Sequence, residues 1–414
     1  MIRETVRVSE DDRHRCTHRC TVLLSAILLP VASSCGFPAP DDKAQIPQYR
    51  SDSLDVPVDG IGFKTAVLQR ITADKFPDLA VAHPVAAKVT VFANITGANP
   101  FAQSTDHGLV PAPSLGSVGL AAGTLSEDGR IALVATHRTD NSVSVFLNPL
   151  VASQPGPVDP LNPFILTTTG SNPSEVAIVD LDGDGKNDIV VTVDNGINVF
   201  RNLGNTDGGG TDRFATPIVL PAPRTPVSLA SGDLDADGNA DLVVADKDGN
   251  VLVFWGDGTV TPPLPTIGTR VAVGDLNHDT KPDIAIVNTT ANTVTVLINN
   301  GDKLFADGIS FATGNGPSFV AIGTIDFDDF ADLVVVARED RRVNVLLHNG
   351  RPTFDAETFG DRGEYPTPPA ILDALPIMVA IGDLNADRPD GQAPDLVVTK
   401  DNGVTVLFHV PPPP

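Results

Sequence analysis

The chain is short of cysteine, of Trp and Tyr, and of basic residues, and each shortage narrows what it can be. Its 414 residues include 3 Cys, 1 Trp and 2 Tyr, and 28 Lys and Arg stand against 52 Asp and Glu. The resulting formal net charge of −24 argues against nucleic acid and anionic lipid as partners, since both attract basic surfaces. The HExxH, GxSxG, phosphate-loop and CxxC motifs are also missing. We therefore expect no enzymatic activity.

Long apolar runs are missing too, apart from one near the N-terminus. Arg13, Arg15 and Arg19 precede an apolar run over 21–32 and then the sequence SSCG. A basic flank, a short apolar segment and small residues describe a secretory signal, and the run is short for a membrane span. The stretch VASSCG resembles a bacterial lipoprotein signal with Cys35 as the lipidated residue; an ordinary secretory signal is the alternative. We expect residues 1–34 to be the signal peptide of an exported protein. It is either anchored at the cell envelope or outer surface by a lipid on Cys35, its sole membrane contact, or secreted.

The cysteines exclude a disulfide-stapled fold. Cys16 and Cys20 lie in the predicted signal, so cleavage before Cys35 leaves one cysteine and no intramolecular bridge. The fold must therefore rest on its core and on bound metal. Residues 35–52 are polar and rich in proline, which is typical of a tether.

What the chain does have is an internal repeat. An acidic residue precedes a β-branched run at regular intervals of about 53 residues, with Ala132 in this place in one copy. The acidic members, called anchors below, are Asp78, Asp188, Asp241, Asp283, Asp332 and Asp395. A second motif follows each anchor in register, as in VTVFAN (89–94), INVFRN (197–202) and VTVLIN (294–299). Its alternating β-branched residues predict a strand, and the Asn at its end indicates a turn.

Each repeat holds about four short strands and no helix, in keeping with 36 Gly and 36 Pro. Seven such units predict an all-β fold, a seven-bladed β-propeller over 53–410. A β-solenoid has much shorter coils, and single four-stranded domains would lack sufficient core. The last repeat has no fourth strand of its own, so we expect the β-like piece at 53–58 to complete it, with 411–414 as a proline tail.

The loop DLDGDGKND at 180–188 places carboxylates at its positions 1, 3, 5 and 9. These are Asp180, Asp182, Asp184 and Asp188, around a turn at Gly185 and the carbonyl of Lys186 at position 7. Alternate carboxylates around a glycine turn supply the oxygen ligands that calcium prefers, as in the first part of an EF-hand loop. An EF-hand would need a glutamate at position 12, where this chain has Val191 inside a strand. A metal-free Asx turn is the alternative interpretation.

Loop and strand motif together resemble the FG-GAP/VCBS repeats of integrin alpha-subunit propellers, over about residues 50–410. The resemblance implies that the loop joins the first two strands of a blade and binds structural calcium on the lower face. It assigns a second site to Asp233, Asp235, Asp237, the Asn239 carbonyl and Asp241. A third comprises Asp275, Asn277, Asp279, the Lys281 carbonyl and Asp283, with Thr280 in place of the glycine. A fourth is interrupted by four extra residues and comprises Asp383, Asn385, Asp387 and Asp395. We expect about three to five calcium ions in all.

The remaining loops depart from this pattern. The loop at Thr324 keeps Asp326, Asp328 and Asp332 and could hold an ion, whereas the two at Arg70 and Thr124 have lost most ligands. His83 and His137 share a register in the turns on the opposite face. They could bind metal or ligand, but we favour solvated turn residues.

Two classes of function remain open. We expect a monomeric binding, scaffolding or adhesion module whose protein or glycan partner binds the face opposite the calcium loops. The alternative is a lectin or polysaccharide-degrading enzyme on the same propeller, which the shortage of Trp and Tyr disfavours.

Overall fold

The computed structural model of the chain describes the following residues: 48–50, 66–69, 71, 77–83, 88–94, 103–108, 117–127, 129–147, 163–204, 213–222, 224–326, 328–351, 353–366, 374–384, 394–401 and 403–410. The predicted signal peptide, Cys35, the piece at 53–58 and the proline tail lie outside these residues. Ala44–Pro414 form one compact unit, and the following description concerns that unit.

All regular structure in the described residues is β-strand, and the sheets are antiparallel, as the repeat predicts. Sheet 1 holds β2 (Ala66–Gln69), β3 (Asp78–His83), β4 (Lys88–Ala93) and β5 (Gln103–Gly108). Sheet 2 holds β6 (Ser117–Thr124), β7 (Ile131–His137), β8 (Ser142–Phe146) and β9 (Phe164–Thr167). Sheet 3 holds β10 (Val176–Val179), β11 (Asp188–Val193), β12 (Gly196–Phe200) and β13 (Ile218–Pro221).

The second half of the chain continues the series. Sheet 4 holds β14 (Pro226–Gly232), β15 (Asp241–Asp246) and β16 (Val251–Phe254). Sheet 5 holds β17 (Arg270–Gly274), β18 (Asp283–Asn288), β19 (Thr293–Leu297) and β22 (Ile309–Ala312), with a small hairpin of β20 (Asn299–Gly301) and β21 (Leu304–Phe305) between the last two. Sheet 6 holds β23 (Pro317–Gly323), β24 (Asp332–Ala337), β25 (Arg342–His348) and β26 (Phe359–Pro366). Sheet 7 holds β27 (Pro376–Gly382), β28 (Asp395–Lys400), β29 (Gly403–Val410) and β1 (Gln48–Arg50).

Sheet 4 lacks a regular fourth strand, and its sequence explains why. The segment after β16 makes a single bridge between Phe254 and Val260, and the amides of Thr261 and Leu264 then donate to Val253 and Val251. Prolines occupy 262, 263 and 265. Because proline has no N–H, this segment cannot sustain a continuous ladder.

Sheet 7 is completed by a strand from the other end of the chain. β1 pairs antiparallel with β29, with Tyr49 opposite His409. This strand lies in the segment predicted to be a tether, and the piece at 53–58 that was expected to complete the sheet lies outside the described residues. QYR carries none of the alternating aliphatic pattern that makes a strand visible in a sequence.

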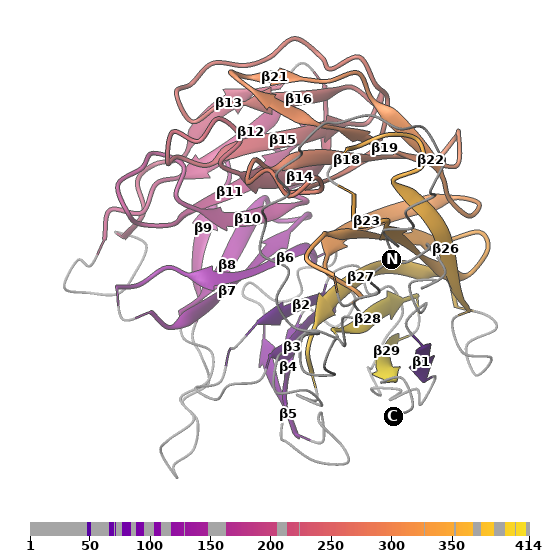
Figure 1. Cartoon of the computed structure of the whole chain (residues 1–414). Coiled ribbons are helices and arrows are strands. Elements are labelled where there is room, and N and C mark those ends of the chain that lie inside the picture. Colours follow the sequence, from indigo (N-terminus) through magenta and orange to yellow (C-terminus); the bar gives the residue numbers. More distant parts are fainter. Residues whose placement is uncertain are drawn as a thin grey trace, which may run out of the picture. The chain divides into compact units, whose positions relative to one another are not determined.

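The sheets of this unit follow one another around a common axis. Their first strands contact each other in the order β2, β6, β10, β14, β17, β23 and β27, and β27 contacts β2 (Figure 1). Seven apolar clusters fill the spaces between consecutive sheets. One of them packs Leu79 and Phe92 of sheet 1 against Val397 and Val406 of sheet 7. The apolar core is thus distributed between sheets, which is the packing of a β-propeller.

Around the axis, small and large residues alternate in contact. Gly232, Gly274, Gly323 and Gly382 end their first strands, each opposite the anchor of its own sheet. A Cβ on Gly274 would lie 2.8 Å from Ile322 Cγ2 of the next sheet, and one on Gly382 would lie 3.1 Å from Leu68 of sheet 1. Glycine is therefore required here for close approach.

Candidate metal centres

The acidic loops join the first strand of a sheet to the second, where the resemblance places them. Positions 4 and 6 of each loop adopt positive φ. The residues are Gly183 and Gly185, Ala236 and Gly238, and His278 and Thr280. Thr280 holds a φ of 72°, a value that glycine adopts more readily. The same sharp turn therefore forms in all three loops, including the one without glycine.

The first carboxylate of each loop closes this turn. Asp180 accepts the N–H groups of Gly183 and Gly185, both at 2.8 Å. Asp233 and Asp275 accept two loop N–H groups each in the same way, over distances of 2.7–3.2 Å. The backbone is thus wrapped around its first acid, which brings the following alternate side chains to one side.

The anchor at position 9 fastens the loop to the sheet. Asp283 is fully buried, and its two oxygens accept the N–H groups of Leu276 and Asn299, both at 2.8 Å. The same pair of bonds recurs at Asp188, Asp241, Asp332 and, for the loop side, Asp395. Each anchor with both bonds thus accepts backbone hydrogen bonds from the loop and from the end of the third strand. It does so even in sheet 6, whose loop lacks the first predicted calcium ligand.

Burial makes these anchors costly to ionise. It is the largest cause that raises the pKa of Asp188 and Asp241 to about 6 and that of Asp283 to about 7, with neighbouring loop acids adding to the shift. A nearby cation would favour the charged form and reverse this shift.

Two loops bring three carboxylates to a common centre. Asp180, Asp182 and Asp188 each offer an oxygen within 4.8 Å of the others, and so do Asp233, Asp235 and Asp237. Calcium binds about six to eight oxygens at about 2.3–2.6 Å, so oxygens this close together can share one ion. The donor sets contain oxygen alone, which fits a hard cation such as calcium.

The other predicted ligands are placed differently. The Asp184 carboxylate pairs with Lys186 Nζ of its own loop, and Asp279 pairs with Lys281 Nζ at 2.9 Å. Among the described residues, the acids of the Asp275 loop do not form such a group of three, since Asn277 replaces one of them. Carbonyl ligation by Lys186, Asn239 and Lys281 stays a prediction. In the fourth site Asp383 and Asp395 are described, whereas Asn385 and Asp387 lie outside the described residues.

Sheet 6 stabilises its loop by aromatic packing. Phe330 stacks on His348 with ring centroids 4.4 Å apart and planes 2° from parallel. Burial and the charge of Asp326 raise the pKa of Asp332 to about 8. A proton on Asp332 removes one negative charge from this loop, as a bound cation would do in the other loops.

A recurring asparagine after the third strand links each of three sheets to the loop of the sheet before it. Asn202 Nδ2 donates to the carbonyls of Leu125, in sheet 2, and Asn187. Asn299 likewise reaches Leu234 of sheet 4, and Asn94 reaches Leu384 of sheet 7. The sequence pattern indicates a turn at this residue, and its repetition in register also indicates a structural role.

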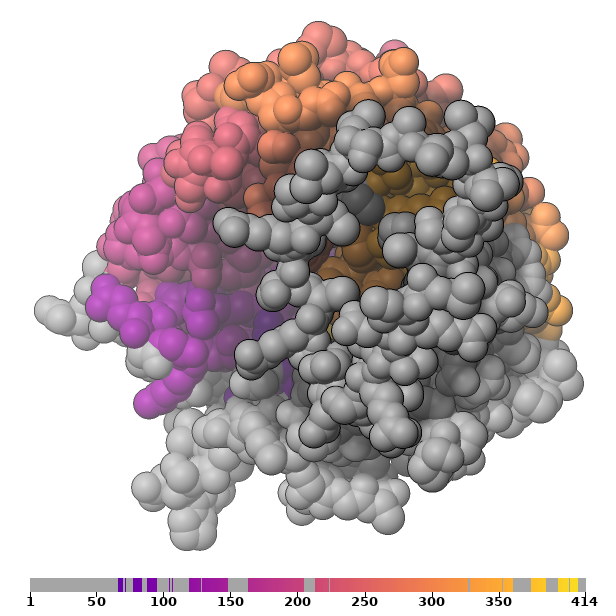
Figure 2. Space-filling model, viewed as in Figure 1, coloured from indigo at the N-terminus to yellow at the C-terminus, as the bar shows by residue number. Residues whose placement is uncertain are grey.

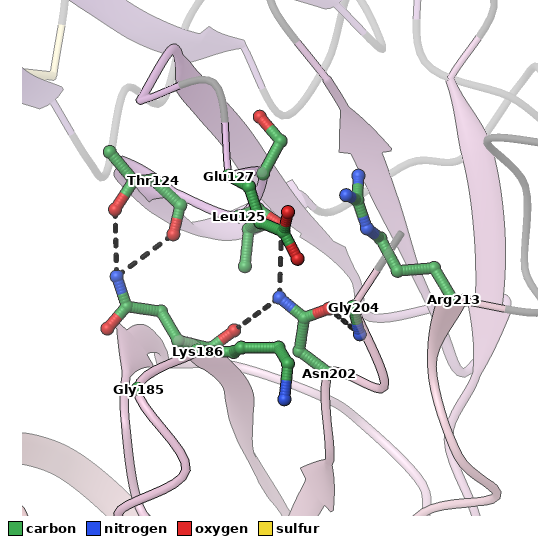
Figure 3. A pocket seen from close by; sticks show the side chains of 10 residues that line it. Thr124, Leu125, Glu127, Gly185, Lys186, Asn202, Gly204 and Arg213 are labelled. Carbon is green, nitrogen blue, oxygen red and sulfur yellow. Dashed lines mark hydrogen bonds between the residues drawn. The ribbon is translucent and has the colours of Figure 1, made fainter. Parts of the chain in front are cut away.

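A small cavity lies beside the Asn202 link, between the loops of sheets 2 and 3. It measures about 70 Å³ and is lined by Thr124, Glu127, Lys186 and Arg213 among others (Figure 3). Asn187 Nδ2 donates to both the carbonyl and the hydroxyl of Thr124, each at 2.9 Å. The Thr124 hydroxyl, at the first ligand position of its loop, is therefore engaged in a bond between sheets.

The two registered histidines are not solvated turn residues, contrary to the interpretation from sequence. His83 and His137 are 2% and 0% exposed. His137 Nε2 lies 2.7 Å from Ser144 Oγ, and burial lowers the pKa of His137 to about 4. They end the second strands β3 and β7, whose side chains are buried on both faces.

No helix in the described part of the chain is long and apolar enough to cross a membrane.

Comparison with known proteins agrees with this architecture. The FG-GAP-like repeat family matches residues 180–244 and 233–286. Among curated proteins, none matches the chain significantly. A catalytically inactive variant of virginiamycin B lyase from Staphylococcus aureus, solved with quinupristin, is similar with a TM-score of 0.58 and 15% identity, over 88% of this chain and 100% of that one.

A second similar structure is BBS1N in complex with ARL6DN, with a TM-score of 0.56 and 15% identity. The match covers 87% of this chain and 98% of that one. Both neighbours are β-propellers, and identities this low speak for the fold alone. The chain is therefore a β-propeller that carries FG-GAP-like repeats over residues 180–286.

Proposed function

We propose that the protein is a calcium-stabilised propeller that acts as a binding, scaffolding or adhesion module. The observation that carries this proposal is the convergence of carboxylate oxygens at Asp180, Asp182 and Asp188, and again at Asp233, Asp235 and Asp237. Four acids in one turn repel one another, and a divalent ion removes that cost. In this proposal calcium supplies positive charge and structural cross-linking, with no part in a reaction.

The loops connect such an ion to the whole ring. The anchor carboxylate accepts the backbone N–H of an asparagine that follows the third strand, as at Asn202 and Asn299. The side chain of the same asparagine donates to a carbonyl in the loop of the preceding sheet. Ordering one loop therefore stabilises the boundary between two sheets. We propose that this replaces the disulfides that cleavage before Cys35 would exclude.

Export and tethering complete the proposal. A signal over 1–34 and a lipid on Cys35 would place the propeller at the cell envelope or outer surface, and a calcium-rich exterior would load the loops. The face opposite the calcium loops is then left for a protein or glycan partner.

The polysaccharide alternative gains little from the aromatic side chains. Trp255, the single Trp of the chain, is 4% exposed, and Lys303 Nζ lies 4.9 Å from the centre of its ring. A covered indole face cannot serve as a stacking platform for a sugar ring.

Chelator titration with thermal melting tests the calcium proposal. Each site stabilises by about 2.7 kcal/mol when free calcium is a hundredfold above its Kd, so EGTA should lower Tm clearly and calcium should restore it better than magnesium. Asp180→Asn should reduce this shift, whereas Asp248→Asn, at an exposed acid between β15 and β16, should leave it unchanged. An unchanged Tm in EGTA contradicts calcium stabilisation. Fractionation of cells carrying Cys35→Ala tests the anchor separately.

A further inference from the structure

In the two loops that bring three carboxylates together, the acid at position 3 contacts a basic side chain from outside the loop. Arg201 NH1 lies 3.3 Å from Asp182 Oδ2, and Lys303 Nζ lies 3.2 Å from Asp235 Oδ2. The third loop carries the neutral Asn277 at this position. Asp182 and Asp235 both belong to the groups of converging carboxylates. The basic residues therefore contact the same side chains that would bind calcium.

Lys303 is held in place by several independent contacts. It also bonds Asp257 Oδ2 at 2.7 Å and lies over the ring of Trp255. Trp255 is in turn stacked on Phe305, with ring centroids 6.4 Å apart. The ammonium group thus joins two carboxylates and an aromatic face.

The backbone that presents Lys303 is itself unusual. Asp302 and Lys303 both adopt positive φ, at 52° and 62°, in the tight hairpin between β20 and β21. Non-glycine residues cost about 1 kcal/mol in this region. Figure 1 shows β21 beside β16, and Figure 2 shows this part of sheets 4 and 5, in salmon and orange, at the surface. Sheet 5 therefore reaches across to the metal loop of sheet 4.

We propose that Lys303 and Arg201 are tethered counter-ions that set the calcium affinity of the Asp233 and Asp180 loops. This inference rests on the proposed calcium function. Before calcium binds, each basic group partly neutralises its loop and holds the position 3 carboxylate in place. When calcium binds, the same positive charge repels the ion or must give up its carboxylate.

The two effects have opposite signs, which separates this role from plain packing. Removing the charge of Lys303 leaves Asp235 and its neighbours uncompensated, so the calcium-free protein should lose stability. The same change removes a positive charge that lies 3.2 Å from a carboxylate oxygen of the proposed site. Coulomb repulsion at that range in a solvated site corresponds to about a tenfold gain in calcium affinity. A residue that merely supports the loop would weaken calcium binding when removed.

Trp255 provides an intrinsic probe of metal bound near Lys303. Tb³⁺ is a calcium substitute whose luminescence is sensitised by a nearby indole, and the chain has a single Trp. Its ring contacts Lys303, which in turn contacts Asp235. Tb³⁺ titration under Trp excitation, followed by displacement with Ca²⁺, therefore measures metal bound near Trp255 in the full-length protein. Asp233→Asn, which should remove the signal, assigns it.

The decisive variant is Lys303→Met, which keeps the aliphatic stem and removes the charge. We expect about tenfold tighter Tb³⁺ and Ca²⁺ binding, together with a lower Tm in EGTA. Lys247→Met is the matched control, because Lys247 pairs with Asp248 outside the metal loops. Arg201→Met, followed by calorimetry with Ca²⁺, should show the same pair of effects at the Asp180 loop.

The outcomes separate this inference from the calcium proposal. If the wild type binds Ca²⁺ and Lys303→Met binds it equally or more weakly, the counter-ion role is wrong while calcium stabilisation stands. If neither Tb³⁺ nor Ca²⁺ binds the wild type, the proposed function fails and this inference fails with it.

Discussion

Replacing Asn299 by alanine should destabilise the propeller more than its single amide suggests. Asn299 is fully buried, and its Nδ2 donates to Leu234 O at 2.6 Å and to Pro282 O at 3.0 Å. Its Oδ1 accepts the N–H of Gly301 at 2.9 Å. Alanine would leave two carbonyls and one amide without these partners, one carbonyl on the neighbouring sheet.

The magnitude follows from these three groups. An unsatisfied buried polar group costs about 1–3 kcal/mol, and partial rehydration of the Gly301 N–H brings the total to about 3–4 kcal/mol. Urea unfolding at saturating calcium measures the change directly. Asn349→Ala is the matched control, since Asn349 is exposed and bonds within its own sheet to Glu357 and Arg351. It should cost less than about 1 kcal/mol.

Equal losses in the two variants would refute the idea that Asn299 couples sheet 5 to sheet 4. A loss confined to the calcium-free protein would instead show that the asparagine acts only while the loop lacks its ion.

Two further predictions concern packing and pH. Gly274→Ala should cost about 1–3 kcal/mol, because its Cβ would lie 2.8 Å from Ile322 Cγ2, whereas Gly403→Ala, with nothing within 4 Å, should be milder; urea unfolding compares them. In EGTA, stability should fall as pH rises from about 5 to about 8. The reason is that the folded pKa of Asp332, about 8, lies above its unfolded value, so folding takes up a proton that is lost through this window. Asp332→Asn should flatten that part of the pH profile of Tm, and an unchanged slope would contradict the assignment.

The sequence predicted the fold because the anchors mark a repeated local event. The second strands β11, β15, β18, β24 and β28 begin at their anchor aspartates, and the third strands follow the alternating motifs. Both patterns are local and strong, since a buried strand needs a continuous apolar run and a turn needs its special residues. The loops were predictable for the same reason.

The sequence did not reveal contacts between residues that lie far apart along the chain. The partners of Asp182 and Asp235 come from Arg201, after the third strand, and from Lys303, in the following repeat. No spacing rule connects them. The closing strand at 48–50 is similar, because a backbone ladder with β29 imposes little on side-chain pattern. His83 and His137 were misjudged because a polar residue at a strand end looks solvated, whereas both side chains are almost fully buried.

Size complementarity around the axis shows what register adds once the sheets are aligned. Where the first strand of a sheet ends in glycine, that glycine faces a large residue, the next-to-last one in the first strand of the following sheet. Gly232 faces Val273 in this way, and Gly323 faces Ile381. Sheet 3 ends instead in Val179, and the matching residue of sheet 4 is the small Ser231. One side of each pair must yield because the first strands approach closely. The ring is therefore specified pair by pair.

Basic side chains beside the calcium loops change the balance of charge there. The three best-formed loops contain eleven acids, which on sequence alone leaves a large excess over the six positive charges of three calcium ions. In the structure four basic side chains, Lys186, Arg201, Lys281 and Lys303, already contact those acids. Seven negative charges then remain for three divalent ions to offset, which is close to balance. Fixed cations that neutralise four of the eleven acids would help the loops to fold before calcium arrives, and would leave the remaining charge to the ions.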